Sequence, residues 1–417
     1  MKKSPKTIED LTGRISYYHV LLLMASLPFD RYFSHVIVIS YALHLLIQFK
    51  KPVLSMHVLI PASVFFITVI STLYTTNLSG ALNEFTLHIP LLVFPLLFCA
   101  DAGVIKKYRD KLLWGFSWVC AATIIYLNLD AVRLILYYKL PYTALFSAAF
   151  TNHNFSAPID MHATFFSLQI GVALVYVLSN LINRKLNRVW NIICLLILSA
   201  GLVQLCSKSV FLALLLIINL AVPYFLLQKN YRLRFWVFSA SVSAALLIII
   251  LSVNVLRTRY ITDLRIDLSS SSKGSLLDSR AARWQVVTDV IKRAPFVGHG
   301  AGTETALLHE EFFKKKYYNS FLNNLNAHNQ YLSFLFKTGT WGLLVYLATL
   351  LFGFFSAVKR KDLLLFTFMV LVGIVSLSEN LLDVDKGVFF YAFFFSLFLF
   401  SASKKRMEKI SLHSDII

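Results

Sequence analysis

The chain has 417 residues, of which 57% are hydrophobic and 15% are charged, and its mean hydropathy is +0.67. A soluble domain carries about 25% charged residues, so this composition indicates a membrane protein and excludes an ordinary soluble domain. The formal net charge of +19 does not indicate a nucleic-acid partner, because most Lys and Arg residues lie in short clusters between apolar spans. Such clusters anchor membrane helices, so we expect contact with membrane lipids and no nucleic acid.

Apolar runs of the length that a membrane helix needs, about 20 residues with a range of roughly 17 to 25, occur twelve times. They cover approximately 13–29, 32–49, 53–74, 85–100, 112–130, 159–180, 189–206, 210–227, 234–256, 340–357, 362–378 and 387–403. Pro28 ends the first run, and Pro90 and Pro95 interrupt the fourth, which neighbouring helices can tolerate. The predicted fold is therefore all-α and polytopic, with about 12 transmembrane helices.

The distribution of positive residues predicts that both termini are cytoplasmic. In that orientation the cytoplasmic segments hold 23 of the 40 Lys and Arg residues, whereas the 75–84 loop holds none and the 379–386 loop holds only Lys386. The long loop then lies outside, and long loops do not obey the rule. The chain thus divides into helices one to nine (1–256), an outer loop (257–328), and helices ten to twelve with a cytoplasmic tail (329–417).

Two further elements are expected outside the membrane. Ser269–Ser272 reads as a flexible bend. Between residues 128 and 158, four apolar or aromatic positions favour a short helix lying along the surface: Val132, Ile135, Leu136 and Tyr138.

A second short helix is predicted to start near Arg280. Asp278 or Ser279 can cap it, and Pro295 stops it. One face of the helix carries an arginine followed by apolar residues: Arg280, Trp284, Val287 and Ile291. This pattern favours a helix on the membrane surface with its guanidinium pointing inward, and the alternative is a surface helix with a solvated Arg280.

Three alternate glycines, Gly298, Gly300 and Gly302, follow that helix. A dinucleotide site would need a strand before them and a helix after them, so they are weak evidence for a nucleotide. We expect them instead to let the backbone turn tightly under the helix.

Two further residues can carry chemistry. His328 lies where the loop re-enters the membrane, and its imidazole can take a proton from a hydroxyl; the alternative is a packing residue. Lys208 lies between two apolar spans at the outer face, either as a snorkelling lysine or as a cation aimed into an outward cavity.

Cations with one base suit a polyanionic lipid donor. A pyrophosphate leaving group needs charge-assisted donors, which Arg supplies bidentately, and a sugar hydroxyl acceptor needs a base. We expect Arg280 and His328 to be catalytic and Lys208, Arg283 and Asn329 to bind substrate. His309-Glu310-Glu311 lacks the second His of a zinc motif, and Cys99, Cys120, Cys194 and Cys206 lack metal-ligand spacing, so we expect no metal and no cofactor.

At these residues the chain resembles the O-antigen ligase and polymerase superfamily. The resemblance lies in Ser279-Arg280-x-x-x-Trp284, then Pro295-x-x-Gly298-x-Gly300-x-Gly302, then Ala327-His328-Asn329-x-Tyr331-Leu332, then Gly339-x-x-Gly342-Leu343. The specific part covers about 65 residues, and the layout of the spans extends the similarity to the whole chain. Where family members often have Ser-Arg-Gly, this chain has Ser207-Lys208-Ser209, which keeps the charge but loses bidentate geometry.

The resemblance implies a GT-C-like membrane glycosyltransferase of the bacterial inner membrane with a periplasmic catalytic loop. Such an enzyme takes a glycan from undecaprenyl pyrophosphate, and a ligase passes it to lipid A–core whereas a polymerase passes it to another glycan repeat unit. The family's functional Arg and His map onto Arg280 and His328. The leading hypothesis is an O-antigen ligase, and the alternatives are an O-antigen polymerase and a polysaccharide transporter, which would usually show an internal repeat that this chain lacks.

Overall fold

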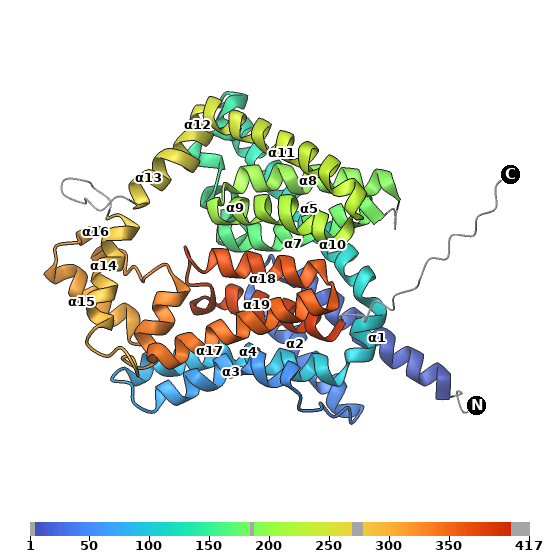
Figure 1. Cartoon of the computed structure of the whole chain (residues 1–417), viewed down its shortest axis with the longest axis horizontal. Coiled ribbons are helices and arrows are strands. Elements are labelled where there is room, and N and C mark those ends of the chain that lie inside the picture. Colours follow the sequence, from blue (N-terminus) through green and yellow to red (C-terminus); the bar gives the residue numbers. More distant parts are fainter. Residues whose placement is uncertain (1–4, 184–186, 269–277, 402–417) are drawn as a thin grey trace.

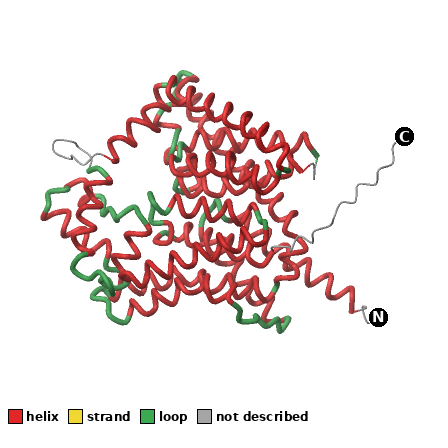
Figure 2. Tube along the Cα trace, viewed as in Figure 1, coloured by secondary structure: helices red, strands yellow, loops and turns green. Residues whose placement is uncertain are grey.

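The computed structural model describes residues 5–183, 187–268 and 278–401, and every regular element in those ranges is a helix (Figure 2). The all-α prediction is therefore confirmed for the described part of the chain. Several predicted features lie outside it: the bend at Ser269–Ser272, the positive residues Lys2, Lys3, Arg184 and Lys185, and the basic cluster after Ser401.

The first half of the chain forms long helices joined by short connections. Their bounds are α1 Pro5–Ser26, α2 Arg31–Ile47, α3 Met56–Thr72, α4 Leu78–Ala100, α5 Ala102–Tyr137, α7 Ala163–Asn183 and α8 Arg188–Leu205. A π-helical turn, η4, joins two helices into one run: α9 Lys208–Leu216, η4 Ile217–Ala221 and α10 Val222–Leu226. Short elements connect α5 to α7: η1 Tyr142–Phe146, η2 Ala148–Phe150, α6 His153–Ser156 and η3 Ala157–Ile159.

The second half consists of one long helix, then a set of short helices, then three long helices. After α11 Lys229–Ser252 come α12 Asn254–Arg257, η5 Thr258–Thr262, α13 Asp263–Leu268, α14 Arg280–Ile291, α15 Glu304–Lys314 and α16 Tyr318–Leu322. The chain continues with α17 Gln330–Arg360, α18 Leu363–Val375, η6 Leu381–Asp383 and α19 Asp385–Ser401.

Seven of the described helices are long and apolar enough to cross a membrane by length and composition. They are α4, α5, α7, α8, the run α9–α10, α11 and α17, and α2, α3 and α18 are shorter apolar helices. The protein thus has several membrane-spanning helices, and the count of twelve spans stays a prediction.

Two predicted elements differ from the observed ones. The short surface helix expected at 132–138 is instead the last part of α5, because neither Gly nor Pro interrupts the chain there. The tenth span, expected from residue 340, begins at Gln330 as α17 and bends at Gly339, whose φ is 65°. Its first turns carry Lys337, a charge that hides the helix from a search for apolar runs.

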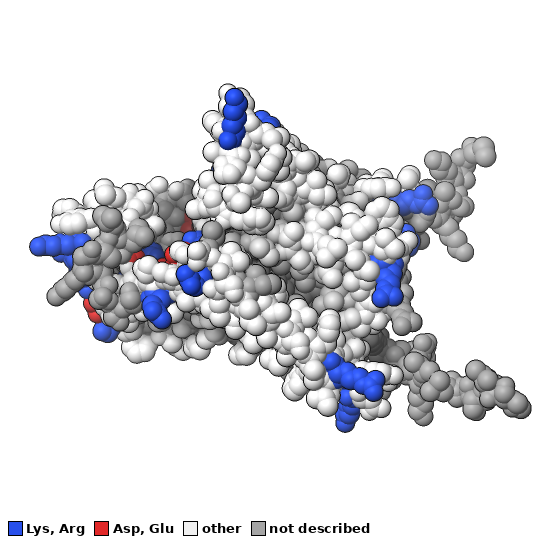
Figure 3. Space-filling view, turned by 90° about the horizontal axis from the view of Figure 1, so that it is seen from above, with Lys and Arg blue, Asp and Glu red and all other residues white. Residues whose placement is uncertain are grey.

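The long helices run between two polar ends. In Figure 1, α14, α15 and α16 lie at the left end, which we call the loop end, and the start of α1 lies at the opposite end. Figure 3 shows Lys and Arg gathered toward the two ends with a broad uncharged surface between them. This is the distribution expected for a membrane protein.

Aromatic side chains of α19 fill the centre between the long helices. Phe390, Phe393, Phe394 and Phe398 are buried, and the main hydrophobic core joins them to α4, α5, α7 and α18. At the opposite end, Arg109 pairs with Asp362 at 2.7 Å and Arg360 donates to the Leu399 carbonyl at 2.7 Å. These contacts fix the ends of α5, α17 and α19 relative to one another, so the loop end is held on a rigid base.

Candidate functional site

Helix α14 is held in place by its cap and by its tryptophan. The Ser279 hydroxyl accepts a hydrogen bond from the Ala282 N–H at 3.2 Å, so the predicted cap at Ser279 is confirmed. Trp284 donates from Nε1 to the Ala327 carbonyl at 2.8 Å, and Val287 packs in a small core with Leu308 and Phe312 of α15. The helix therefore carries Arg280 beside the segment that leads into α17.

The glycine-rich turn contacts the long helices, and its backbone adopts the tight conformation that the three glycines predict. Gly298, Gly300 and Gly302 have φ values of 77°, 94° and 73°, which side chains disfavour. A Cβ atom on Gly302 would lie 2.1 Å from the Gly80 backbone carbon, so no larger residue fits. The Gly302 N–H donates to Glu84 at 2.7 Å, and the Gly300 N–H donates to the Lys337 carbonyl at 2.8 Å.

The structure brings Arg280 and His328 together on one carboxylate, Glu379. His328 Nδ1 lies 3.3 Å from Glu379 Oε2, and Arg280 Nη2 lies 3.8 Å from Oε1. Arg280 also donates from Nη1 to the Ser378 carbonyl at 2.7 Å. Burial alone would raise the pKa of Glu379, but the hydrogen bond from His328 and the surrounding charges outweigh it and hold that pKa below its usual value.

Lys208 joins the same cluster through a second carboxylate. Its Nζ lies 3.2 Å from Asp267 Oδ2, and Arg280 Nε lies 3.7 Å from the same oxygen. Three residues from separate parts of the sequence, Lys208, Arg280 and His328, thus surround two acidic side chains. We call these five residues the cation cluster.

Arg283, one turn after Arg280, is 5% exposed. Its Nε and Nη1 atoms are buried and have no hydrogen-bond partner within the described ranges. Burial, with Arg280 nearby, lowers the pKa of Arg283 to about 10, which still leaves it charged at neutral pH. Buried N–H groups without acceptors are costly, so an anion that accepted hydrogen bonds from Nε and Nη1 would stabilise this position.

Asn329 is used within the protein. Its side-chain oxygen caps α17 by accepting from the N–H groups of Tyr331 and Leu332 at 3.0 and 3.1 Å, and its nitrogen donates to the Leu377 carbonyl at 3.3 Å. In this arrangement Asn329 orients the backbone next to His328. Its predicted role in binding substrate stays a prediction.

Two histidines that the sequence did not single out lie beside the cation cluster. The rings of His153 and His162 are 4.2 Å apart, and both are electrostatically coupled to Glu379 and His328. Burial lowers the pKa of His162 to about 4, so the residue is neutral at pH 7. Its Nδ1 is buried and finds no hydrogen-bond partner among the described residues.

A second ionic group lies beneath the glycine-rich turn. Lys337 Nζ donates to Glu84 at 2.7 Å and to Asp383 at 2.8 Å, and these two carboxylates with His88 could otherwise hold a metal ion. Since the ammonium already lies between the two carboxylates, this group does not fit a metal. Glu304 is also buried here, and burial raises its pKa.

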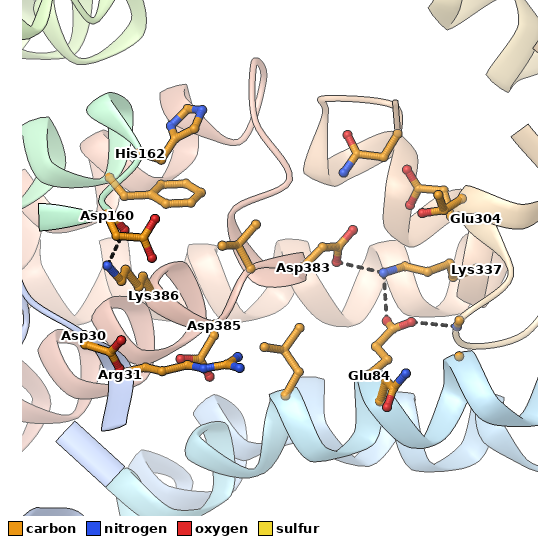
Figure 4. A pocket seen from close by; sticks show the side chains of 18 residues that line it. Asp30, Arg31, Glu84, Asp160, His162, Glu304, Lys337, Asp383, Asp385 and Lys386 are labelled. Carbon is orange, nitrogen blue, oxygen red and sulfur yellow. Dashed lines mark hydrogen bonds and ion pairs between the residues drawn. The ribbon is translucent and has the colours of Figure 1, made fainter. Parts of the chain in front are cut away.

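A pocket of about 940 Å³ opens beside this second ionic group at the loop end (Figure 4). Residues from the α1–α2 connection, α4, the start of α7, α15 and η6 line it. Glu84, Lys337 and Asp383 lie on one side of the pocket, and His162 and Asp160 lie on the other (Figure 4).

Comparison with known proteins assigns the central part of the chain. Residues 193–347 match the family model Wzy_C, described as O-antigen ligase. This match supports the predicted resemblance of the segment to the O-antigen ligase and polymerase superfamily. It contains Lys208, Arg280, Arg283, His328 and Asn329, so the family match includes every predicted site residue. No curated protein matches the chain.

The acidic partners in the site were missed from the sequence. Glu379 follows His328 by 51 residues and lies in a loop whose positive residues alone were counted. Asp267 lies just before the expected bend and has no motif around it. The sequence does carry a signal for the second ionic group. Lys337 and Glu84 are ionisable residues beside apolar spans, and such residues are functional or structural candidates by default.

Proposed function

We propose that the protein is an O-antigen ligase, which transfers a glycan from undecaprenyl pyrophosphate to a sugar hydroxyl of lipid A–core at the periplasmic face of the bacterial inner membrane. The observation that carries this proposal is the convergence of Lys208, Arg280 and His328, all within the matched segment, on Asp267 and Glu379.

Binding of the donor pyrophosphate is assigned to the arginines. Arg280 has only long contacts to its two carboxylates, 3.7 and 3.8 Å, which a phosphate oxygen can replace. Arg283 has two buried unpartnered N–H groups, which an anion would satisfy. Lys208 adds a third charge nearby, so the cluster can neutralise the leaving group.

Removal of the acceptor proton is assigned to His328. If Nδ1–H donates to Glu379, the lone pair of Nε2 is free to accept a proton, and Nε2 has no partner among the described residues. The carboxylate also stabilises the imidazolium that forms. A positioned base of this kind typically contributes about 10²–10⁴-fold to the rate.

This mechanism uses no metal ion, because cationic side chains neutralise the pyrophosphate. Purified protein assayed with lipid-linked donor and acceptor in excess chelator should therefore keep its activity. Loss of activity in chelator, restored by added divalent cation, would contradict this part of the proposal.

The glycans of a deletion strain distinguish ligase from polymerase and transporter. A ligase deletion should accumulate lipid-linked polymer and leave bare core. Core that carries a single repeat unit would instead indicate an O-antigen polymerase joining repeat units. Donor accumulated on the cytoplasmic side would indicate the polysaccharide transporter.

A further inference from the structure

We propose that the 940 Å³ pocket beside Lys337 binds the terminal sugars of the acceptor glycan, and that its negative lining keeps the pyrophosphate donor out. This inference rests on the proposed function and assigns the acceptor to a site of its own. The shared chemistry of the occupant is a polyhydroxyl sugar without phosphate, whether it comes from core or from a glycan repeat.

Three residues of the pocket lining connect the pocket to the segment that carries His328, although His328 itself does not line it. Asn326 accepts from the His328 N–H at 3.0 Å, and Glu304 accepts from the Ala327 N–H at 2.9 Å, so two lining residues hold the backbone of the proposed base. His162 lines the pocket and is coupled to Glu379 and His328. The pocket is therefore adjacent to the segment that carries His328, and a glycan bound there can extend toward this residue.

The net charges of the cation cluster and of the pocket lining differ in sign. Apart from His328, the cation cluster and Arg283 supply three cations and two carboxylates: Lys208, Arg280 and Arg283, with Asp267 and Glu379. The pocket is lined by six carboxylates and three cations: Asp30, Glu84, Asp160, Glu304, Asp383 and Asp385, with Arg31, Lys337 and Lys386. Two of the cations are already engaged, Lys337 by Glu84 and Asp383, and Lys386 by the Ile159 and Asp160 carbonyls.

The lining otherwise suits a sugar. Carboxylates accept hydrogen bonds from hydroxyls, and the Asn83 and Asn326 amides offer both donors and acceptors. His162 brings a neutral imidazole with an unpartnered Nδ1, and Phe165 brings an aromatic ring for the apolar face of a sugar. A pocket of about 300–1,000 Å³ with convergent polar groups is the usual form of a small-ligand site. The carboxylates of the pocket would repel a pyrophosphate, because the lining has too few cations to neutralise its charge.

The test places a large side chain in the pocket at a lining residue whose side chain does not stabilise the fold. Asn83 lines the pocket, and its side chain makes no hydrogen bond among the described residues. The neighbouring Leu82 is 52% exposed and does not line the pocket. Asn83→Trp is therefore matched by Leu82→Trp as a control. Each purified variant is assayed for donor affinity and for the KM of the acceptor, with wild type as reference.

We expect Asn83→Trp to raise the acceptor KM at least about tenfold, which corresponds to the loss of one or two hydrogen bonds to the sugar. Its donor affinity should be unchanged, and Leu82→Trp should behave like wild type. Free core oligosaccharide and free repeat-unit oligosaccharide are then added as competitors. Competition by either one supports the pocket and identifies the source of the acceptor, and competition by neither would overturn it.

Two results would overturn the inference while leaving the proposed function standing. One is weaker donor binding by Asn83→Trp with an unchanged acceptor KM, and the other is wild-type behaviour of Asn83→Trp. Thr305→Trp, which fills the pocket from α15, repeats the test if Asn83→Trp is poorly produced. Failure of the proposed function is distinct, because wild-type protein itself would then transfer no glycan.

Discussion

Glu379 contacts both residues to which we assign the chemistry, and so its charge determines how each of them behaves. As an anion it orients His328 through Nδ1 and restrains Arg280. Because the Glu379 side chain is buried, water screens its charge only weakly. Both roles depend on the carboxylate staying ionised.

The pKa of Glu379 predicts how stability depends on pH. Because the folded pKa lies below the ordinary value of about 4.3, the ionised carboxylate stabilises the fold above that pH, and this contribution is lost as the pH falls through the folded pKa. Glu379→Gln should therefore lower the melting temperature at pH 7, and the difference from wild type should shrink below about pH 4. A difference that stays constant from pH 7 to pH 3 would contradict this account.

Substitutions of Arg280 should reduce glycan transfer from the donor to different degrees. Charge-assisted hydrogen bonds are worth about 1.5–3 kcal/mol each, so Arg280→Ala should lose most activity. Arg280→Lys should recover only part of it, because the two-pronged geometry is lost. Donor affinity and kcat, measured on protein present at wild-type levels in the membrane, check this. Full activity of Arg280→Ala would mean that the arginine is a solvated surface residue.

Sequence reasoning found the cations and the base but not what holds them. Arg280 and His328 stand in motifs of recognisable spacing. Glu379, in the α18–α19 connection, and Asp267, in α13, approach them only through tertiary packing. Both acidic residues are too far along the chain from Arg280 and His328 for a local pattern to link them. The role of Asn329 as a cap was visible in principle, because Asn before an apolar run is a helix-start signal.

At the scale of elements, the glycine-rich turn determines how the loop sits on the long helices. Gly302→Ala should destabilise the protein by about 1–3 kcal/mol or more, since it adds a strained φ of 73° to a 2.1 Å clash with Gly80. Gly103→Ala is the matched control: it lies in α5, and a Cβ there meets no atom within 4 Å. Thermal unfolding in detergent compares them, and equal melting temperatures would contradict this role.

Elements were predictable where apolar periodicity was strong and unpredictable where polar residues enter a long helix. The last turns of α5 carry Asp130 and Arg133, and the first turns of α17 carry Lys337. The sequence therefore predicts a surface helix for the first stretch, and it predicts that the tenth span begins only at residue 340. Burial of Lys337 between two carboxylates is a tertiary effect that no window of sequence contains.

At the scale of the whole molecule, the distribution of positive residues predicts which end of the helices faces the periplasm. In a cysteine-free background, an impermeant thiol reagent added from the periplasm should label Asn323→Cys, in the exposed segment after α16, and miss Lys361→Cys, between α17 and α18. The opposite labelling would place the cation cluster in the cytoplasm and contradict the proposed donor and acceptor.

The central claim is that glycan transfer occurs at His328 within the cation cluster. The most direct measurement is single-turnover transfer by purified protein from a polyprenyl-pyrophosphate-linked glycan to its acceptor, compared between wild type and His328→Gln. We predict that His328→Gln binds the donor normally and transfers at least about tenfold more slowly, a low bound for the loss of a base. Transfer by His328→Gln at the wild-type rate would contradict the assignment.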